Sequence, residues 1–201
     1  MNPNEPSKEN TCLRAARPHR QAAGILRLFV YGTLKRGCWN HDRFCRGVLS
    51  VEEAVVRGSL YELPSGIPVL EVPEADVLAH GTADPLADVA TQARLTAEFA
   101  APVCVANATG RRAAHPELGE NGAPGGRWGP VYGELLTFDD PETRLPAINR
   151  LQGVHPVGPS LYRRVLVPVC IRQEVVVGAW AYAGESEQRF RRLLLAGRRP
   201  S

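Results

Sequence analysis

The sequence contains no apolar run that approaches the ~18 residues needed to cross a bilayer. Its first 21 residues are polar and lack the apolar core of a secretory signal, and Glu5 and Glu9 are uncharacteristic of an organelle transit peptide. These absences argue against membrane, secreted and organellar proteins. We therefore expect a soluble, cytoplasmic protein with no membrane partner.

The chain has few cysteines, and their spacing forms no recognisable pairs. There are 5 cysteines, an odd number, and none forms a CxxC pair, which argues against a disulfide framework and favours a reducing compartment. Cys38, His41 and Cys45 could supply three zinc ligands if their segment were helical, but no fourth ligand stands nearby. We expect ordinary thiols here, no metal and no cofactor.

The chain also lacks a large excess of positive or negative charge. The net charge is only +3, and it comes mostly from arginines at the two ends. Basic ends could contact nucleic acid or anionic lipid, but solvated tails are the explanation that we favour. Binders of single-stranded nucleic acid interleave aromatic residues with basic ones, and these tails carry only Phe190. We expect no nucleic-acid partner.

The length of 201 residues and the 44% hydrophobic content suit a single well-buried domain with peripheral segments. Residues 1–24 have almost no large apolar side chains and are expected to form a disordered arm. The domain should span residues 25–185, with an insertion rich in alanine, glycine and proline at about 73–128. Residues 186–201 should form an amphipathic helix and a basic tail.

Apolar alternation predicts strands at 28–31, 51–63, 131–138, 162–171 and 175–182, and Gly58 could mark a bulge in the second. Helices are predicted at 40–49, from Pro85 onward with Asp84 as its cap, and at 141–151 despite Pro146. On the helix after Pro85, the expected buried face consists of Leu86, Val89, Ala90 and Ala93. Because antiparallel hairpins dominate this order, we expect an α+β fold, namely a small mixed, mostly antiparallel β-barrel with a few peripheral helices.

The most informative segment is the end of the first strand. Leu28 to Tyr31 suit a buried strand, and Gly32 allows an immediate tight turn. The backbone N–H groups of Gly32, Thr33 and Leu34 would then point outward together, and such a nest of amides binds a carboxylate or phosphate without any side chain. An ordinary glycine turn after a strand remains the alternative.

Four segments in order carry a resemblance to a known family. They are Tyr31–Gly37 followed by Asn40 and His41, then 61–70 (YELPSGIPVL), 131–136 (VYGELL) and 160–169 (SLYRRVLVPV). Together they resemble the gamma-glutamylcyclotransferase-like family, with the greatest likeness to gamma-glutamylamine cyclotransferases. The resemblance implies the same barrel architecture and a small-molecule gamma-glutamyl substrate, and it leaves the oligomeric state open.

The reaction that the resemblance implies converts a gamma-glutamyl amide to 5-oxoproline and a free amine. The substrate's own α-amino group attacks its γ-carbonyl, so a carboxylate must first take a proton from that amino group. By the resemblance, Tyr31, Gly32, Thr33 and Leu34 would grip the substrate, and Tyr162 would lie beside the pocket. Tyr162 could orient the substrate or make one structural hydrogen bond.

One position departs from the family pattern. The segment that should end in a catalytic Glu followed by Gly reads Leu145 to Val154, with Gln152 in the place of the glutamate. A side-chain amide has no usable basicity near neutral pH, so Gln152 could accept a hydrogen bond but could not take the proton. Glu134 is the best candidate for a substitute base, followed by Glu62, Asp139 and Glu142.

The sequence therefore leaves two main hypotheses open. The first is a cyclotransferase that works with a displaced base or slowly through water. The second is a non-catalytic binding or scaffold protein for gamma-glutamyl compounds that keeps the pocket without turnover.

Overall fold

A computed structural model describes residues 24–100, 128–154, 160–172 and 175–184 of the chain. The predicted N-terminal arm, the C-terminal helix and tail, and the second half of the predicted insertion lie outside these residues, so they stay predictions. The strands are β1 (Leu26–Val30), β2 (Ser50–Glu62), β3 (Pro68–Glu71), β4 (Ala79–His80), β5 (Gly129–Phe138), β6 (Tyr162–Ile171) and β7 (Val175–Gly184). The helices are α1 (His41–Phe44), the short 3-10 helix η1 (Glu74–Asp76), α2 (Pro85–Ala100) and α3 (Pro141–Leu151).

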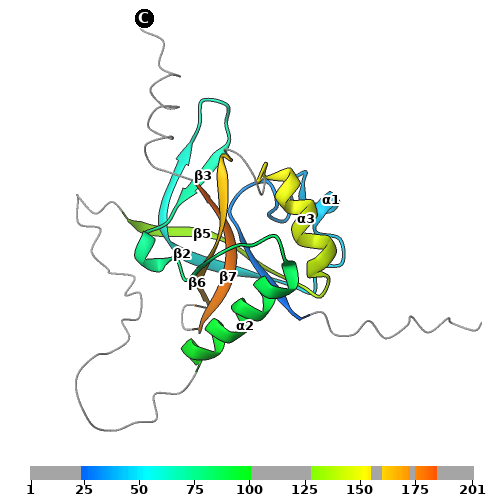
Figure 1. The fold of residues 1–201 in the computed structure, drawn as a ribbon. Helices are drawn as coiled ribbons and strands as arrows, with labels where there is room; N and C mark the ends of the chain where they lie inside the picture. Colours follow the sequence, from blue (N-terminus) through cyan, green and yellow to red (C-terminus); the bar gives the residue numbers. More distant parts are fainter. Residues whose placement is uncertain (1–23, 101–127, 155–159, 173–174, 185–201) are drawn as a thin grey trace, which may run out of the picture.

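The strands close into a barrel (Figure 1). Around the ring, β1 pairs with β5, β5 with β2, β2 with β6, β6 with β7, and β7 returns to β1. Only the β1–β7 and β3–β7 pairs are parallel among the described strands. The expected mixed, mostly antiparallel β-barrel with peripheral helices is confirmed.

Alternation along the strands divides the core into two layers. One cluster, drawn only from strands and their ends, contains Phe29, Val165, Val167, Val169 and the alanines 179, 181 and 183, and it fills the barrel. The intervening residues, including Leu28 and Trp180, face outward and pack against α2 and α3 in a second cluster. Valine and alanine therefore predominate inside the barrel, and larger side chains such as Trp180 lie beneath the helices.

Two glycines are needed because other atoms come very close to the backbone. A Cβ on Gly58 would lie 2.5 Å from the carbonyl oxygen of Glu71, and one on Gly133 would lie 2.4 Å from that of Val30. Gly58 pairs one-to-one with Gly129 in the ladder, so the bulge considered from the sequence does not form.

Helix α1 is shorter than predicted. It ends at Phe44, because Cys45 leaves the helical region and Gly47 adopts a φ of +79°. Phe44 and Val48 nevertheless pack against the outer core, whereas Leu49 is exposed. The predicted apolar spacing thus reflects packing of a helical turn and a following loop.

Helix α2 begins at Pro85 as predicted, and Asp84 Oδ1 accepts hydrogen bonds from the amides of Leu86 and Ala87 at 2.9 and 3.2 Å. The predicted apolar face was wrong. Leu86, Ala90 and Ala93 are exposed, and of the four residues only Val89 is buried.

The face of α2 that docks on the barrel is polar. It carries Asp88, Gln92 and Thr96, four residues apart and therefore on one side of the helix. Gln92 donates to the carbonyl of Ile25 at 2.8 Å and accepts from the amide of Arg27 at 2.9 Å, so its side chain pairs with the start of β1. Thr96 Oγ1 accepts from the amide of Gly178 at 3.1 Å.

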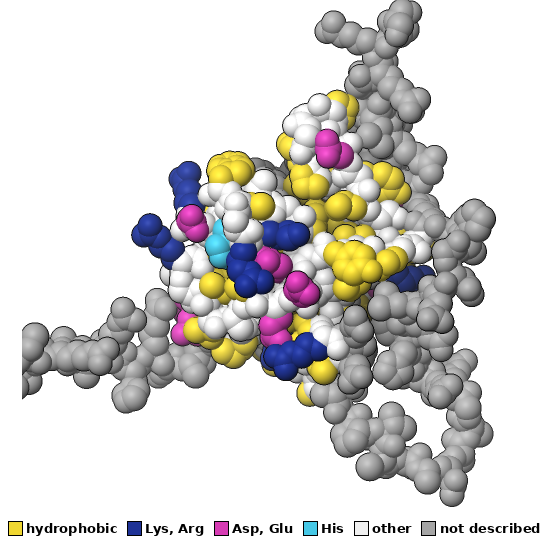
Figure 2. Space-filling model, turned by 180° about the vertical axis from the view of Figure 1, so that it is seen from behind, with side chains coloured by type: hydrophobic (Ala, Val, Ile, Leu, Met, Phe, Trp, Pro, Cys, Tyr) yellow, Lys and Arg dark blue, Asp and Glu magenta, His cyan; other side chains and the backbone are white. Residues whose placement is uncertain are grey.

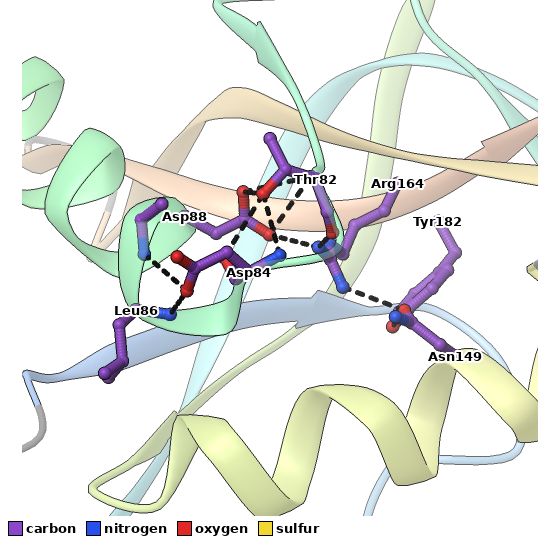
Figure 3. A network of polar contacts seen from close by, with 8 residues as sticks. Thr82, Asp84, Leu86, Asp88, Asn149, Arg164 and Tyr182 are labelled. Atoms are coloured by element: carbon purple, nitrogen blue, oxygen red, sulfur yellow. Dashed lines mark hydrogen bonds and ion pairs between the residues drawn. The ribbon is translucent and has the colours of Figure 1, made fainter. Parts of the chain in front are cut away.

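Asp88 pairs with Arg164 on β6, and both side chains are almost fully buried, with 2% and 3% exposed. Arg164 also donates to Thr82 O at 2.8 Å and to Asn149 Oδ1 on α3 at 2.9 Å (Figure 3). Asn149 Oδ1 accepts a second hydrogen bond, at 2.7 Å, from the hydroxyl of Tyr182 on β7. One guanidinium therefore links α2, the loop before it, β6 and α3.

Replacing Asp88 by alanine should leave Arg164 charged, buried and without its carboxylate, which costs about 3–5 kcal/mol of unfolding free energy. The matched control is Glu98→Ala on the same helix, where the pair with Arg94 is exposed and should contribute at most about 1 kcal/mol. Urea denaturation of both variants measures the difference. Equal losses would show that the buried pair has no special weight.

Replacing Gly133 by alanine should lower the unfolding free energy by about 2 kcal/mol or more, because the new methyl group overlaps the Val30 carbonyl and the Phe29 ring. Gly129→Ala on the same strand is the control, since nothing lies within 4 Å of a Cβ there. Thermal and urea denaturation should separate the two variants. A Gly133→Ala protein as stable as Gly129→Ala would contradict the close approach.

Candidate functional site

The turn after β1 has its carbonyl oxygens bound to the protein. Gly32 O accepts from the amide of Lys35 at 3.0 Å, and Leu34 O accepts from His41 Nδ1 at 2.8 Å. Cys45 Sγ lies 3.8 Å from the same Leu34 oxygen. His41 and Cys45, considered above as zinc ligands, therefore both contact this carbonyl. Among the described residues no cluster of three or more His, Cys, Asp or Glu is arranged to hold a metal.

The amides of the same turn are left available. No turn or loop hydrogen bond in the described part of the chain uses the N–H groups of Gly32, Thr33 or Leu34. All three residues line a cavity of about 500 Å³. Bound carbonyls and available amides are the arrangement that a backbone anion nest requires.

Glu134 fixes the turn from the side of the barrel. Its carboxylate accepts from the amide of Arg36 at 2.8 Å and from Arg36 Nε at 3.1 Å. The side chain of Glu134 is only 11% exposed, whereas that of Arg36 is 55% exposed. Neither residue, nor Lys35, lines the cavity.

The cavity is built from four parts of the chain: the turn region, the 66–68 loop, the end of α3, and the strands β6 and β7. Its described lining is Phe29 to Leu34, Trp39, Asn40, Gly66, Ile67, Pro68, Leu151, Gln152, Gly153, Leu161, Tyr162 and Tyr182. This described lining contains no Asp, Glu, Lys, Arg or His. Exposed hydrophobic side chains also occur outside the cavity lining. Figure 2 shows hydrophobic side chains on one face of the molecule, next to acidic and basic side chains.

Three tyrosines in the wall use their hydroxyl groups internally. Tyr31 donates to Tyr182 O at 2.6 Å and accepts from the amide of Leu70, and Tyr162 donates to Pro68 O at 2.6 Å. Burial raises the pKa of Tyr162 to about 12, and it raises the pKa values of Tyr31 and Tyr182 further. Their hydroxyl protons thus stabilise the wall, and the structural hydrogen bond considered for Tyr162 is present.

Gln152 follows the last turn of α3. The helix ends in a left-handed glycine, Gly153, at φ +63°, with Gly153 N donating to Arg150 O and Val154 N to Asn149 O. This pair of hydrogen bonds is a Schellman motif, which fixes where residue 152 stands. The Gln152 side chain is half-buried, lines the cavity and makes no hydrogen bond with the described residues.

Comparison with known proteins shows what part of the chain resembles. Residues 28–97 match the family model described as gamma-glutamyl cyclotransferase, AIG2-like. Over these residues the chain is similar to the gamma-glutamylcyclotransferase-like family. A crystal structure of an AIG2-like protein from Mus musculus is similar at 16% identity, with a TM-score of 0.41 and coverage of 82% of this chain and 81% of that one. No curated protein matches the sequence.

The cavity brings together most of the site residues named from the sequence. Tyr31, Gly32, Thr33, Leu34, Gln152 and Tyr162 all line it. Glu134 does not, and its carboxylate is engaged by Arg36, so the geometry favours a role in positioning the turn. The further candidate bases Glu62, Asp139 and Glu142 are exposed and also lie outside the lining.

Sequence reasoning missed Trp39, Asn40 and Tyr182. Asn40 belongs to the quoted N-terminal motif but had no assigned role, although an asparagine so close to a turn of available amides could have suggested one. It is only 3% exposed, and its Nδ2 donates to Thr33 Oγ1 at 2.9 Å. Its Oδ1 is buried and has no hydrogen-bond partner.

The tyrosine wall predicts a loss of stability at high pH. Because the folded-state pKa of Tyr162 is raised above its ordinary value of 10.0, its contribution is complete below pH 10 and is lost as pH rises through about 12. Unfolding free energies measured between pH 8 and 12 should therefore decline above pH 10. The Tyr162→Phe variant should decline less steeply, and an identical slope would contradict the assignment.

Proposed function

We propose that this protein binds a gamma-glutamyl amine or peptide in the cavity, with the ligand's α-carboxylate on the amides of Gly32, Thr33 and Leu34. The observation that carries the proposal is the set of available backbone amides in a cavity of a gamma-glutamylcyclotransferase-like protein. An anion held by several N–H donors needs no cationic side chain. The apolar wall around Ile67, Pro68 and Leu161 suits the remaining chain of the ligand.

Binding is better supported than turnover. Ring closure requires removal of a proton from the α-amino group, and by the sequence resemblance Gln152 takes the place of the family's carboxylate. An amide cannot take that proton, and the described lining supplies no acid in its place. We therefore favour binding without efficient cyclisation.

Slow cyclisation to 5-oxoproline is the second candidate. An intramolecular attack already has its two reacting groups in one molecule, so a pocket that bends the substrate supplies part of the acceleration. Gln152 Oε1 can still accept a hydrogen bond from the α-amino group. Glu134 would act as base only after its contacts with Arg36 were broken.

We further propose that the protein acts in the cytoplasm on a small molecule, without nucleic-acid or membrane partners. The cysteine pattern supports a reducing compartment. No helix within the described ranges is both long and apolar enough to cross a membrane.

The Gln152→Glu variant should gain cyclotransferase activity, because it places a carboxylate in a pocket that is otherwise complete. The expected gain is about 10²- to 10⁴-fold over the native chain, the usual size of a general-base contribution. The assay is 5-oxoproline release from a panel of gamma-glutamyl amines and dipeptides. Calorimetric titration of the same panel tests binding by the native chain.

Arg150→Glu is the control, because residue 150 is exposed on the same helix and outside the cavity lining. It should gain no activity. Native activity equal to that of Gln152→Glu, and abolished by Glu134→Gln, would identify Glu134 as a working base and overturn the binding-only proposal. If no member of the panel binds or reacts, the proposed function is wrong.

A further inference from the structure

The polar groups available in the described lining are all uncharged. Besides backbone carbonyl oxygens, they include the three amides of the turn, the Thr33 hydroxyl, the side-chain amide of Gln152 and Asn40 Oδ1. The three tyrosine hydroxyl protons are already donated to carbonyl or amide oxygens of the protein. The site therefore favours an anion and offers nothing of opposite charge to a cation.

This balance disfavours a free α-ammonium. An ammonium group brings three N–H donors and a full positive charge, and burying a charge without a counter-charge is costly. The described lining offers it no carboxylate, and its unpaired side-chain amide oxygens are those of Gln152 and Asn40. A family member with glutamate in place of Gln152 would offer a carboxylate, so the substitution removes the main attraction for a charged nitrogen.

A side-chain amide is instead complementary to another amide. Its oxygen and one N–H lie on the same edge, so it can donate to a carbonyl and accept from an N–H together. Gln92 shows this use of glutamine within the same chain, because it donates to Ile25 O and accepts from Arg27 N. A lactam presents its N–H and its carbonyl on one edge, because the ring holds the amide cis, whereas an open-chain secondary amide is trans.

We infer that the cavity selects a carboxylate whose neighbouring nitrogen is part of a neutral lactam, as in 5-oxoproline, over one that carries a free ammonium. The carboxylate lies on the turn amides and the lactam edge pairs with Gln152. The inference rests on the carboxylate position of the proposed function, and it shifts the preferred ligand from the gamma-glutamyl compound to the neutral lactam that ring closure of such a compound forms. This site then retains the lactam that a cyclotransferase would release.

Asn40 strengthens the argument from an independent observation. Asn40 lines the cavity, its Oδ1 is buried without a hydrogen-bond partner, and a buried acceptor left unpaired is costly. A ligand N–H close to the turn would satisfy it. One neutral N–H meets the two side-chain amide oxygens without any need for a counter-charge.

The experiment measures the affinity of the full chain for three matched five-membered ring acids by calorimetry. 5-Oxoproline has a neutral lactam, proline has a charged ring nitrogen, and cyclopentanecarboxylate has no nitrogen. 5-Oxoproline should bind about tenfold or more tightly than either of the others, the size of one mismatched buried hydrogen bond. Gamma-glutamyl methylamide, with its free ammonium, should bind more weakly than 5-oxoproline.

Two variants of one residue separate charge from hydrogen bonding. Gln152→Glu should weaken the binding of 5-oxoproline about tenfold and strengthen the binding of gamma-glutamyl methylamide, because the amide donor is replaced by a negative charge. Gln152→Leu should weaken the binding of 5-oxoproline without strengthening the binding of gamma-glutamyl methylamide. Thermal denaturation of both checks that they remain folded, and the exposed Arg150→Glu change should leave all four affinities unaltered.

The outcomes separate the two proposals. If proline or the methylamide binds as tightly as 5-oxoproline, the lactam preference is wrong while the carboxylate position stands. If cyclopentanecarboxylate equals 5-oxoproline, or Gln152→Leu loses nothing, Gln152 does not read the amide and the inference fails in the same way. If none of the four ligands binds, the proposed function fails and the inference fails with it.

Discussion

The arrangement of the helices around the barrel depends on the buried pair of Arg164 and Asp88. Its two ends belong to β6 and α2, and Nη1 and Nη2 of the guanidinium also donate to Asn149 Oδ1 and Thr82 O. Such a pair is costly to desolvate, so its value lies in specifying one arrangement rather than in adding much net stability. Here it fixes α2 against the barrel, and through Asn149 it holds the last turn of α3.

The positions of the residues that line the cavity depend on this ion pair and on the hydrogen bonds to carbonyl oxygens of the turn after β1. Asn149 lies one turn before Gln152. Tyr182, whose hydroxyl donates to the same Asn149 Oδ1 as Arg164 does, forms part of the cavity wall. On the other side, His41 and Glu134 hold the turn that exposes its amides. Groups that never contact a ligand therefore decide where the ligand-facing groups stand, as expected of a preorganised site.

The parts of the fold that follow from local pattern were predictable. The strands β6 and β7, the start of α2 at Asp84 and Pro85, and the run of α3 past Pro146 agree with the sequence because caps and alternation act over a few residues. The face of α2 was not predictable, since Asp88, Gln92 and Thr96 bind partners up to 82 positions away in the sequence. The shared cavity of Gly32, Gln152 and Tyr162 was expected from the family resemblance. The unpaired Asn40 oxygen and the hydrogen bonds of the tyrosine hydroxyls could not be predicted, because they depend on where the side chains lie in the folded chain.

The freedom of the Gln152 side chain has an evolutionary consequence. The helix end is secured by backbone hydrogen bonds and by Gly153, and the glutamine amide makes none with the described residues, so no structural role ties the position to one residue type. Codons for glutamine and glutamate differ by a single nucleotide. A lineage could therefore move between a pocket with a base and a pocket without one in a single step, while selection on the barrel itself stays unchanged.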